Sequence, residues 1–362
     1  MPQLRKFDFY LFLPTIFLLG FGIVTLSSVS PTSLDSHLLY AFIALIFFFF
    51  FSFLDLEILF PLSPLIYVFC LLFLILPFFV GTVTRGSIRW IPIGQFTIQP
   101  SEIVKPLLAL ICAWYWAKKT VSLKTFLFFS FLLSPIIILI FFQPDLGSTL
   151  SVLSIFAGSL FALRIKPRQF FVFSAIIIIA LPLVWFSLKN YQKTRITHFL
   201  DPYSDPLGKG YNLIQAKIAV GSGEFWGRGL GRGTQSHLTF LPERNTDFVF
   251  AALAEETGLA GSSFVFILYL FLFLRILKIA FHAEENFPNG RLFFLLSMGL
   301  FFYLSFQVIV NIGMNIGLLP ITGITLPLVS YGGSSLLTNM ISLGILESIS
   351  IRSRQEETIQ IK

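Results

Sequence analysis

The apolar run FYLFLPTIFLLGFGIVTL, from Phe9 to Leu26, decides the fold class of this chain. Its length of about 18 residues is close to the roughly 20 that a helix needs to cross the hydrocarbon core of a bilayer. A helix suits that environment because it pairs its own backbone groups, each of which would cost several kcal/mol unpaired. Arg5 and Lys6 precede the run, as in a secretory signal peptide, so cleavage near Val29 is the alternative. The run exceeds the usual apolar part of a signal peptide, and we therefore expect a retained first span.

Similar runs fill most of the 362 residues. The chain is 56% hydrophobic and only 12% charged, with a mean hydropathy of +0.85, which excludes an ordinary soluble domain. The predicted spans cover residues 9–28, 38–54, 61–80, 101–117, 124–142, 146–163, 169–188, 248–274, 291–312 and 326–350. We expect an all-α polytopic membrane protein of about ten transmembrane helices, with residues 1–362 forming a single domain.

The distribution of basic residues orients these spans. The net charge is +7, yet no basic tail or Lys/Arg-rich run indicates nucleic acid as a partner. With both termini in the cytoplasm, fourteen of the 25 basic residues fall on the cytoplasmic side, as the positive-inside rule requires. Eight of the others lie in residues 189–247, a long extracytoplasmic loop between spans seven and eight, and long loops are exempt from the rule. We expect function in this loop and in the span ends that face it.

Several common kinds of site are not indicated. Cys70 and Cys112 lie in apolar runs, so no disulfide framework is predicted. His198 and His237 have no serine elbow nearby, and no spacing is typical of zinc. The segment GSGEFWGRGLGRG, residues 221–233, fits neither nucleotide-binding glycine pattern. It is either a flexible connector or a close-approach loop whose arginines supply charge.

Two polar stretches interrupt the apolar pattern on the outer side. In GSIRWIPIGQFTIQPSEIVKP, residues 86–106, Pro100 suits a first helical turn, and Glu102 and Lys105 share one helix face. They form either an internal ion pair or, with Arg89, a cationic surface for an anionic headgroup. In FFQPDLGSTL, residues 141–150, Asp145 is either favoured by the helix dipole or catalytic.

A third polar stretch, LPERNTDFVFAALAEETG, spans residues 241–258. Asn245 or Thr246 is expected to cap the eighth span, which would place Asp247 in its first turn. Glu255 and Glu256 lie deeper and are expected to bind buried cations or hydroxyls. A carboxylate at the membrane boundary beside a basic loop suits one chemistry well. It would deprotonate a sugar hydroxyl while cations stabilise a departing diphosphate.

Together with FLDPYSDPLGKGYNLIQAKIAVGSG, GTQSHLTFLPER and LPLVSYGGSSLL, these motifs resemble the SEDS family of shape, elongation, division and sporulation proteins over nearly the whole chain. The segments GTQSHLTFLPER and NIGM are more similar to its rod-shape branch than to its division branch, where alanine commonly replaces Arg244. Ser148 stands where threonine is usual.

The resemblance implies a ten-span peptidoglycan glycosyltransferase that polymerises lipid II at the outer face of the cell membrane, releasing undecaprenyl diphosphate. A class B penicillin-binding transpeptidase is the implied partner, besides membrane lipids. The essential aspartate of the TDF motif maps onto Asp247. The substrate-binding residues expected from the motifs are Arg89, Glu102, Lys105, Asp145, Arg195, Lys217, Gln235 and Ser330, with a divalent cation such as Mg or Mn as a further candidate.

Two other classes of function stay open on sequence alone. A transporter or flippase of the lipid-linked precursor would also need a polar cavity, and residues 323–335, GITLPLVSYGGSS, resemble a broken helix. A noncatalytic scaffold is the third, but it does not explain costly charges such as Glu102 and Lys105.

Overall fold

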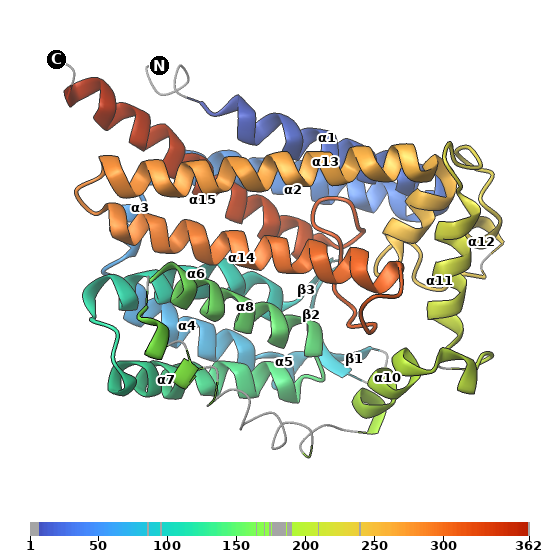
Figure 1. Cartoon of the computed structure of the whole chain (residues 1–362), viewed down its shortest axis with the longest axis horizontal. Helices are drawn as coiled ribbons and strands as arrows, with labels where there is room; N and C mark the ends of the chain where they lie inside the picture. The colour runs from blue at the N-terminus through green and yellow to red at the C-terminus, as the bar shows by residue number, and fades with distance from the viewer. Residues whose placement is uncertain are drawn as a thin grey trace.

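A computed structural model describes residues 7–84, 87–94, 96–163, 165–169, 171–173, 175, 186, 190–208, 210–238 and 240–360. Long helices lie side by side in one bundle (Figure 1). Both chain termini lie at one end of the bundle, here called the terminal end, and residues 190–247 lie at the other, here called the loop end (Figure 1). This arrangement separates the long loop from the termini, as the alternation of spans predicts.

The first half of the chain supplies helices and one small sheet. The helices are α1 (Phe9–Val29), η2 (Pro31–Ser33), α2 (Leu34–Phe53), α3 (Leu56–Leu59), α4 (Ser63–Ile75), α5 (Pro77–Val80), α6 (Pro100–Lys118), α7 (Leu123–Phe142) and α8 (Leu146–Ala162). Pro100 is the first residue of α6, where its missing N–H leaves no intrahelical bond unmade.

The second half completes the bundle. Its elements are α10 (Asn190–Leu200), η3 (Pro202–Ser204), α11 (Tyr211–Ser222), α12 (Thr234–His237), α13 (Val249–Asn286), α14 (Gly290–Asn315) and α15 (Gly333–Gln360). The tenth span was predicted from residue 326, which is wrong. Residues 316–332 form a loop and helix begins only at Gly333, because the Pro- and Gly-containing stretch cannot continue a helix.

Seven helices of the described chain are long and apolar enough to cross a membrane. The shorter apolar helix α8 and the more polar α6 run beside them in the bundle (Figure 1). The predicted seventh span, residues 169–188, lies almost wholly outside the described residues. The fold is that of a multi-pass α-helical membrane protein, and about ten spans accord with it.

A three-stranded antiparallel sheet was not predicted. It consists of β1 (Thr82–Thr84), β2 (Ser87–Ile93) and β3 (Phe96–Ile98), in that order. Its residues are mostly β-branched or aromatic, and Gly94 takes the positive φ of +61° that the tight turn between β2 and β3 requires. The sheet leads directly into α6, so it fixes Arg89 on β2 beside the start of that helix.

Helices α14 and α15 form the centre of the bundle, where most of their side chains are buried. Helix α14 packs against α13, α8 and α6, while α15 packs against α2. Polar residues that enter these helices are therefore held among apolar neighbours, where each one needs a hydrogen-bond partner.

Candidate active site

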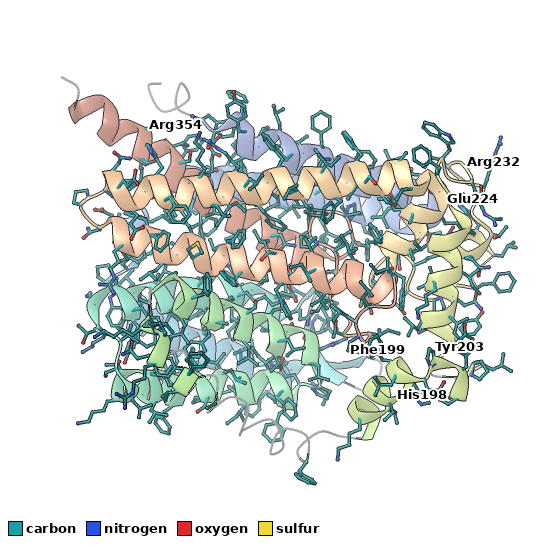
Figure 2. All side chains as sticks on the ribbon, in the orientation of Figure 1. His198, Phe199, Tyr203, Glu224, Arg232 and Arg354 are labelled. Atoms are coloured by element: carbon teal, nitrogen blue, oxygen red, sulfur yellow. The ribbon has the colours of Figure 1, made fainter. Side chains whose placement is uncertain are left out.

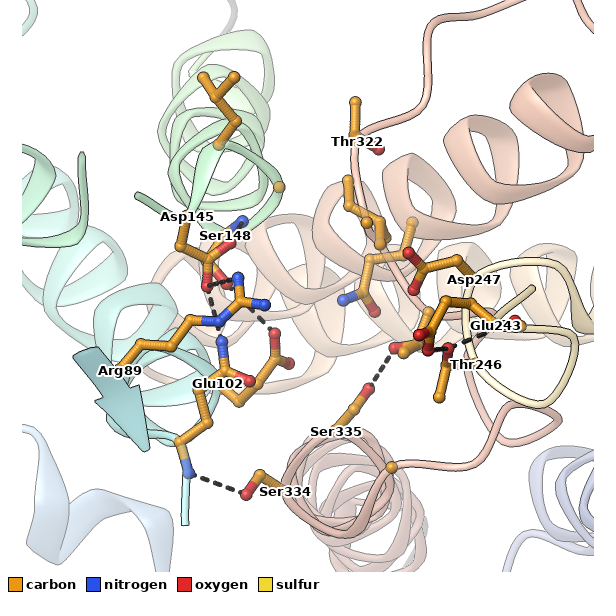
Figure 3. Close-up of a pocket in the computed structure, with 18 of the residues that line it drawn as sticks. Arg89, Glu102, Asp145, Ser148, Glu243, Thr246, Asp247, Thr322, Ser334 and Ser335 are labelled. Atoms are coloured by element: carbon orange, nitrogen blue, oxygen red, sulfur yellow. Dashed lines mark hydrogen bonds and ion pairs between the residues drawn. The ribbon is translucent and has the colours of Figure 1, made fainter. Parts of the chain in front are cut away.

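A polar cavity of about 630 Å³ opens at the loop end of the bundle. It lies between the β2–α6 segment, the start of α8, the segment before α13 and the loop before α15. Five of the predicted site residues line it: Arg89, Glu102, Lys105, Asp145 and Asp247. In Figure 3, Arg89, Glu102 and Asp145 lie on one side and Asp247 lies on the other. Segments more than 140 positions apart in the sequence thus meet at one site.

Asp145 organises the first side of the cavity. As the N-cap of α8 it accepts a hydrogen bond from Ser148 N at 3.0 Å, so its helix-start role is confirmed. Its other oxygen accepts from Gln99 Nε2 at 2.6 Å and from Ser101 Oγ at 3.2 Å. Arg89 Nη1 lies 3.9 Å from the same oxygen, a long ion pair, and Arg89 Nε has no hydrogen-bond partner among the described residues. Arg89 therefore retains donors that a ligand could use.

Glu102 and Lys105 form the internal ion pair that their spacing predicts. Lys105 Nζ lies 2.5 Å from Glu102 Oε1, which also accepts from Ser148 Oγ at 3.2 Å. The Lys105 side chain is 1% exposed, and its Nζ lies 5.4 Å from the ring centre of Tyr303. The pair is thus deeply placed, and its charges largely compensate one another.

Asp247 was expected in the first turn of α13, but it lies before the helix begins. The helix begins at Val249, its N-cap is Phe248, and no side chain of the preceding segment caps it. Thr246 bonds instead to Glu243 Oε2, at 3.1 Å. The predicted capping by Asn245 or Thr246 is therefore wrong.

Two asparagine side chains of α14 pair the backbone groups at the start of α13 instead. Asn315 Oδ1 accepts from Ala251 N at 3.0 Å, which satisfies one of the unpaired N–H groups that begin any helix. Asn311 Nδ2 and Asn315 Nδ2 donate to Asp247 O at 3.0 and 3.1 Å. Both asparagines are fully buried. They hold the backbone of Asp247 and direct its side chain to the cavity.

The loop before α15 supports the same segment from the other side. Ser330 Oγ donates to Thr246 O at 2.6 Å, and Tyr331 N donates to Asn245 O at 2.8 Å. At Gly323 (φ +78°), an added Cβ would lie only 3.6 Å from Asp247 Oδ2. Ser330 is therefore placed to position the segment, and it does not line the cavity.

Two other predicted binding residues, Lys217 and Gln235, also lie apart from the cavity. Lys217 is exposed on α11, where its side chain packs directly on Gly317. Gln235 lies in α12 and its N–H donates to Glu255 Oε1. Arg195 belongs to α10, and its side chain is outside the described part of the structure.

The two buried glutamates bind the long loop. Glu255 accepts from Gln235 N, Ser236 N and Ser236 Oγ at 2.8 to 2.9 Å. Glu256 Oε1 accepts from Ser28 Oγ at 2.5 Å and lies 2.9 Å from His237 Nε2. The expectation that they serve hydroxyls is confirmed, and their effect is to fasten α12 to α13.

The glycine-rich segment, residues 221–233, fills a break in α13. Helical geometry is interrupted at Gly258 (φ +67°, ψ −165°). Arg228 N and Gly229 N donate to the carbonyls of Glu255 and Glu256, at 3.0 Å each. Beyond the break, two N–H groups of α13 donate to the carbonyls of residues 224 and 225. The segment is thus a docked loop that pairs the backbone of a broken helix, and neither a phosphate cradle nor a loose connector describes it.

Sequence reasoning missed several residues of the site. These are Gln99, Glu243, Gln307, Asn311, Asn315 and Ser334. A signal for Asn311 was present, because an amide inside the predicted apolar span of residues 291–312 implies a buried partner, whereas Asn315 lies beyond that span. In the part of the chain that the structure describes, no group of three or more His, Cys, Asp or Glu is arranged to hold a metal ion, and the divalent cation stays a prediction.

Comparison with known proteins places the chain in a family. Residues 9–355 match the model of the FtsW, RodA and SpoVE cell cycle proteins. The chain is 41% identical over 290 residues to the peptidoglycan glycosyltransferase MrdB of Escherichia coli K12, covering 79% of this chain and 77% of the relative. It is 38% identical over 274 residues to a probable peptidoglycan glycosyltransferase FtsW of Nitrosomonas europaea, covering 75% and 70%.

Solved structures with a similar fold support the same family assignment. A chain of a peptidoglycan synthase complex that coordinates polymerization and crosslinking has a TM-score of 0.82 and 30% identity, with 96% of this chain and 99% of that chain covered. The rod shape determining protein RodA of Thermus thermophilus has a TM-score of 0.71 and 28% identity, with 96% and 97% covered. This chain therefore belongs to the FtsW, RodA and SpoVE family, the SEDS proteins that its motifs resemble.

Proposed function

We propose that this chain is a peptidoglycan glycosyltransferase that polymerises lipid II during cell elongation and releases undecaprenyl diphosphate. One observation carries the proposal. A single cavity at the loop end places the Asp247 carboxylate opposite Arg89, with room between them for the reacting ends of two sugars. Relatives named as peptidoglycan glycosyltransferases, at 38 to 41% identity, support it.

Asp247 is the proposed general base. It accepts the proton of the 4-hydroxyl on the acceptor's N-acetylglucosamine, whose oxygen forms a bond to C1 of the donor's N-acetylmuramic acid. The bond between C1 and the diphosphate oxygen breaks, and its electron pair leaves with the diphosphate. This single displacement inverts the configuration at C1. A base needs a fixed position within hydrogen-bond reach of the hydroxyl. The buried amides Asn311 and Asn315 supply it by holding the Asp247 backbone.

Arg89 is the better placed of the two predicted diphosphate ligands. Lys105 is buried and paired with Glu102 at 2.5 Å, so an incoming anion would have to compete with a short contact. Arg89 has a long ion pair and an unpaired Nε, so it can turn towards a diphosphate without breaking a strong bond. Its guanidinium also matches the bidentate geometry of phosphate oxygens. We assign Lys105 and Glu102 to shaping the cavity floor.

The loop end is proposed to face the outside of the cell membrane and the terminal end the cytoplasm. The helix ends and connections at the terminal end carry many of the described basic residues, among them Lys118, Lys119, Arg168, Lys278 and Arg291, in keeping with the positive-inside rule. A class B penicillin-binding transpeptidase is the proposed partner, supported by the structural similarity to a chain of a peptidoglycan synthase complex.

Purified chain given fluorescent lipid II should make glycan strands without any partner protein. Asp247→Asn keeps the shape of the side chain and removes the base, so strand formation should stop while thermal unfolding stays unchanged. Lys217→Gln, which removes a charge outside the cavity, is the matched control and should polymerise normally. Undiminished polymerisation by Asp247→Asn would remove this residue as the base.

The alternative, a flippase of the same precursor, is less well supported. Alternating access requires a polar path that reaches both ends of the bundle. The polar cavity opens at the loop end, and the buried side chains of α14 and α15 that pack at the centre of the bundle include many apolar ones, such as Leu300, Leu343 and Leu346. Polymer formation by the isolated chain would separate the two functions.

A further inference from the structure

A second pocket lies at the terminal end of the bundle, between the start of α1, the later part of α13 and the end of α15. Its volume is about 360 Å³. Its lining residues are Tyr10, Arg275, Lys278, Ile279, His282, Ser350, Ser353 and Arg354. Arg354 marks this end in Figure 2, opposite Glu224 and Arg232 of the docked loop. The unbroken part of α13 from Leu259 to Arg275 alone spans about 24 Å at roughly 1.5 Å per helical residue, so the pocket is remote from the proposed reaction.

The pocket has a net positive charge. Its cations are Arg275, Lys278 and Arg354, and the carboxylates behind them are Asp8 and Glu347. Asp8 is fully buried and accepts from Arg275 Nη2 at 2.6 Å, while Arg354 Nη2 lies 3.2 Å from it. These bonds fix the two guanidinium groups in place. Within the described residues, Arg275 Nη1 makes no hydrogen bond and Lys278 makes no ion pair, so donors remain for an anion.

Lys278 has unusual surroundings for a lysine. It shares one face of α13 with Phe271, Leu274 and Phe281, at spacings of three and four positions, and these three side chains are about half exposed. An exposed apolar stripe on a membrane helix faces acyl chains. A lysine on such a stripe extends its ammonium group to the headgroup level. Tyr10 closes the neighbouring side, with its ring centre 5.5 Å from the Arg275 guanidinium carbon.

We infer that this basic pocket binds the phosphodiester headgroup of an anionic glycerophospholipid, with the acyl chains along Phe271 and Leu274 of α13. Basic pockets between transmembrane helices on the cytoplasmic side suit such headgroups. The apolar stripe beside the pocket favours a lipid over free phosphate, which would not contact it. The inference does not depend on the proposed glycosyl transfer, because it concerns a separate pocket.

Native mass spectrometry of the full-length chain, titrated with phosphatidylglycerol or phosphatidylcholine in neutral detergent, tests this assignment. Phosphatidylglycerol should bind preferentially. Lys278→Gln should weaken that binding about fivefold, the factor expected for one basic residue at a membrane surface. Lys119→Gln removes the same charge at the same end but outside the pocket, and should have no effect. Arg275 is left intact because its loss would remove three of the hydrogen bonds that the buried Asp8 carboxylate accepts.

Three results would overturn the assignment. Equal binding of the two lipids would show that charge does not select the ligand. Equal weakening by Lys119→Gln would show a general surface effect. Inorganic phosphate that binds as tightly as phosphatidylglycerol, and competes with it, would identify a free anion as the ligand.

Discussion

The two buried asparagines of α14 give the sharpest test of how the proposed base is positioned. In Asn311→Leu, a somewhat larger side chain with the same branching at Cγ replaces the amide, so no cavity is created. Ile324 O then loses its 2.7 Å donor, while Asp247 O keeps Asn315. In Asn315→Leu, Ala251 N loses its acceptor and Asp247 O keeps Asn311. Each single change therefore leaves one buried backbone group unpaired, at about 1 to 3 kcal/mol.

The double variant differs in kind from either single one. Asp247 O loses both of its asparagine donors only when both residues change. The segment can then shift, and a displacement of about 1 Å at a reacting group costs roughly 100-fold in rate. We expect each single variant to lose severalfold in the initial rate on fluorescent lipid II, and the double variant to lose more than the product of the two.

A matched control separates positioning from stability. Tyr67 donates to Leu132 O at 2.7 Å, between α4 and α7, so Tyr67→Phe also removes one donor from a backbone carbonyl. Thermal unfolding in detergent should report losses of similar size for this control and for the single asparagine variants, but only the latter should be slow. Full polymerisation rates in the double variant, or losses that simply multiply, would refute the positioning argument.

The remaining predictions concern the cavity and the helix break. Arg89→Ala should reduce polymerisation more than Arg89→Lys, since lysine keeps the charge but not the bidentate geometry; equal rates for the two variants would speak against a diphosphate contact. Lys105→Met should lower the free energy of unfolding by about 3 to 5 kcal/mol by leaving the Glu102 carboxylate buried alone, and Glu102→Gln in the same chain should restore much of it, as read by thermal unfolding. Gly258→Ala should destabilise the chain strongly, because the added Cβ would lie 2.2 Å from a backbone nitrogen of the docked loop at a positive φ. Gly20→Ala, where nothing lies within 4 Å, should be harmless, and similar melting temperatures for the two alanine variants would contradict this account of the break.

Local patterns predicted much of the architecture. Apolar runs gave nine of the ten expected spans within a few residues at most of their boundaries, because crossing a bilayer sets a length that a short window of sequence contains. The helix ends that were predicted wrongly also have local causes. Helix α13 continues to Asn286, beyond its apolar run, since amphipathic turns can extend outside the membrane, and α15 begins later than its run because of the loop before it.

What the sequence by itself determined about this protein is its membrane character, the ends of most helices and pairs within one helix turn, such as Glu102 with Lys105. Only the tertiary structure decided that Asp247 faces Arg89 across one cavity, and that residues 64 and 68 positions away hold its backbone. It also decided that a glycine-rich loop fills a broken helix. The physical reason is range: hydropathy and helix periodicity act over a few turns, whereas these contacts arise when distant buried polar groups must find partners during packing.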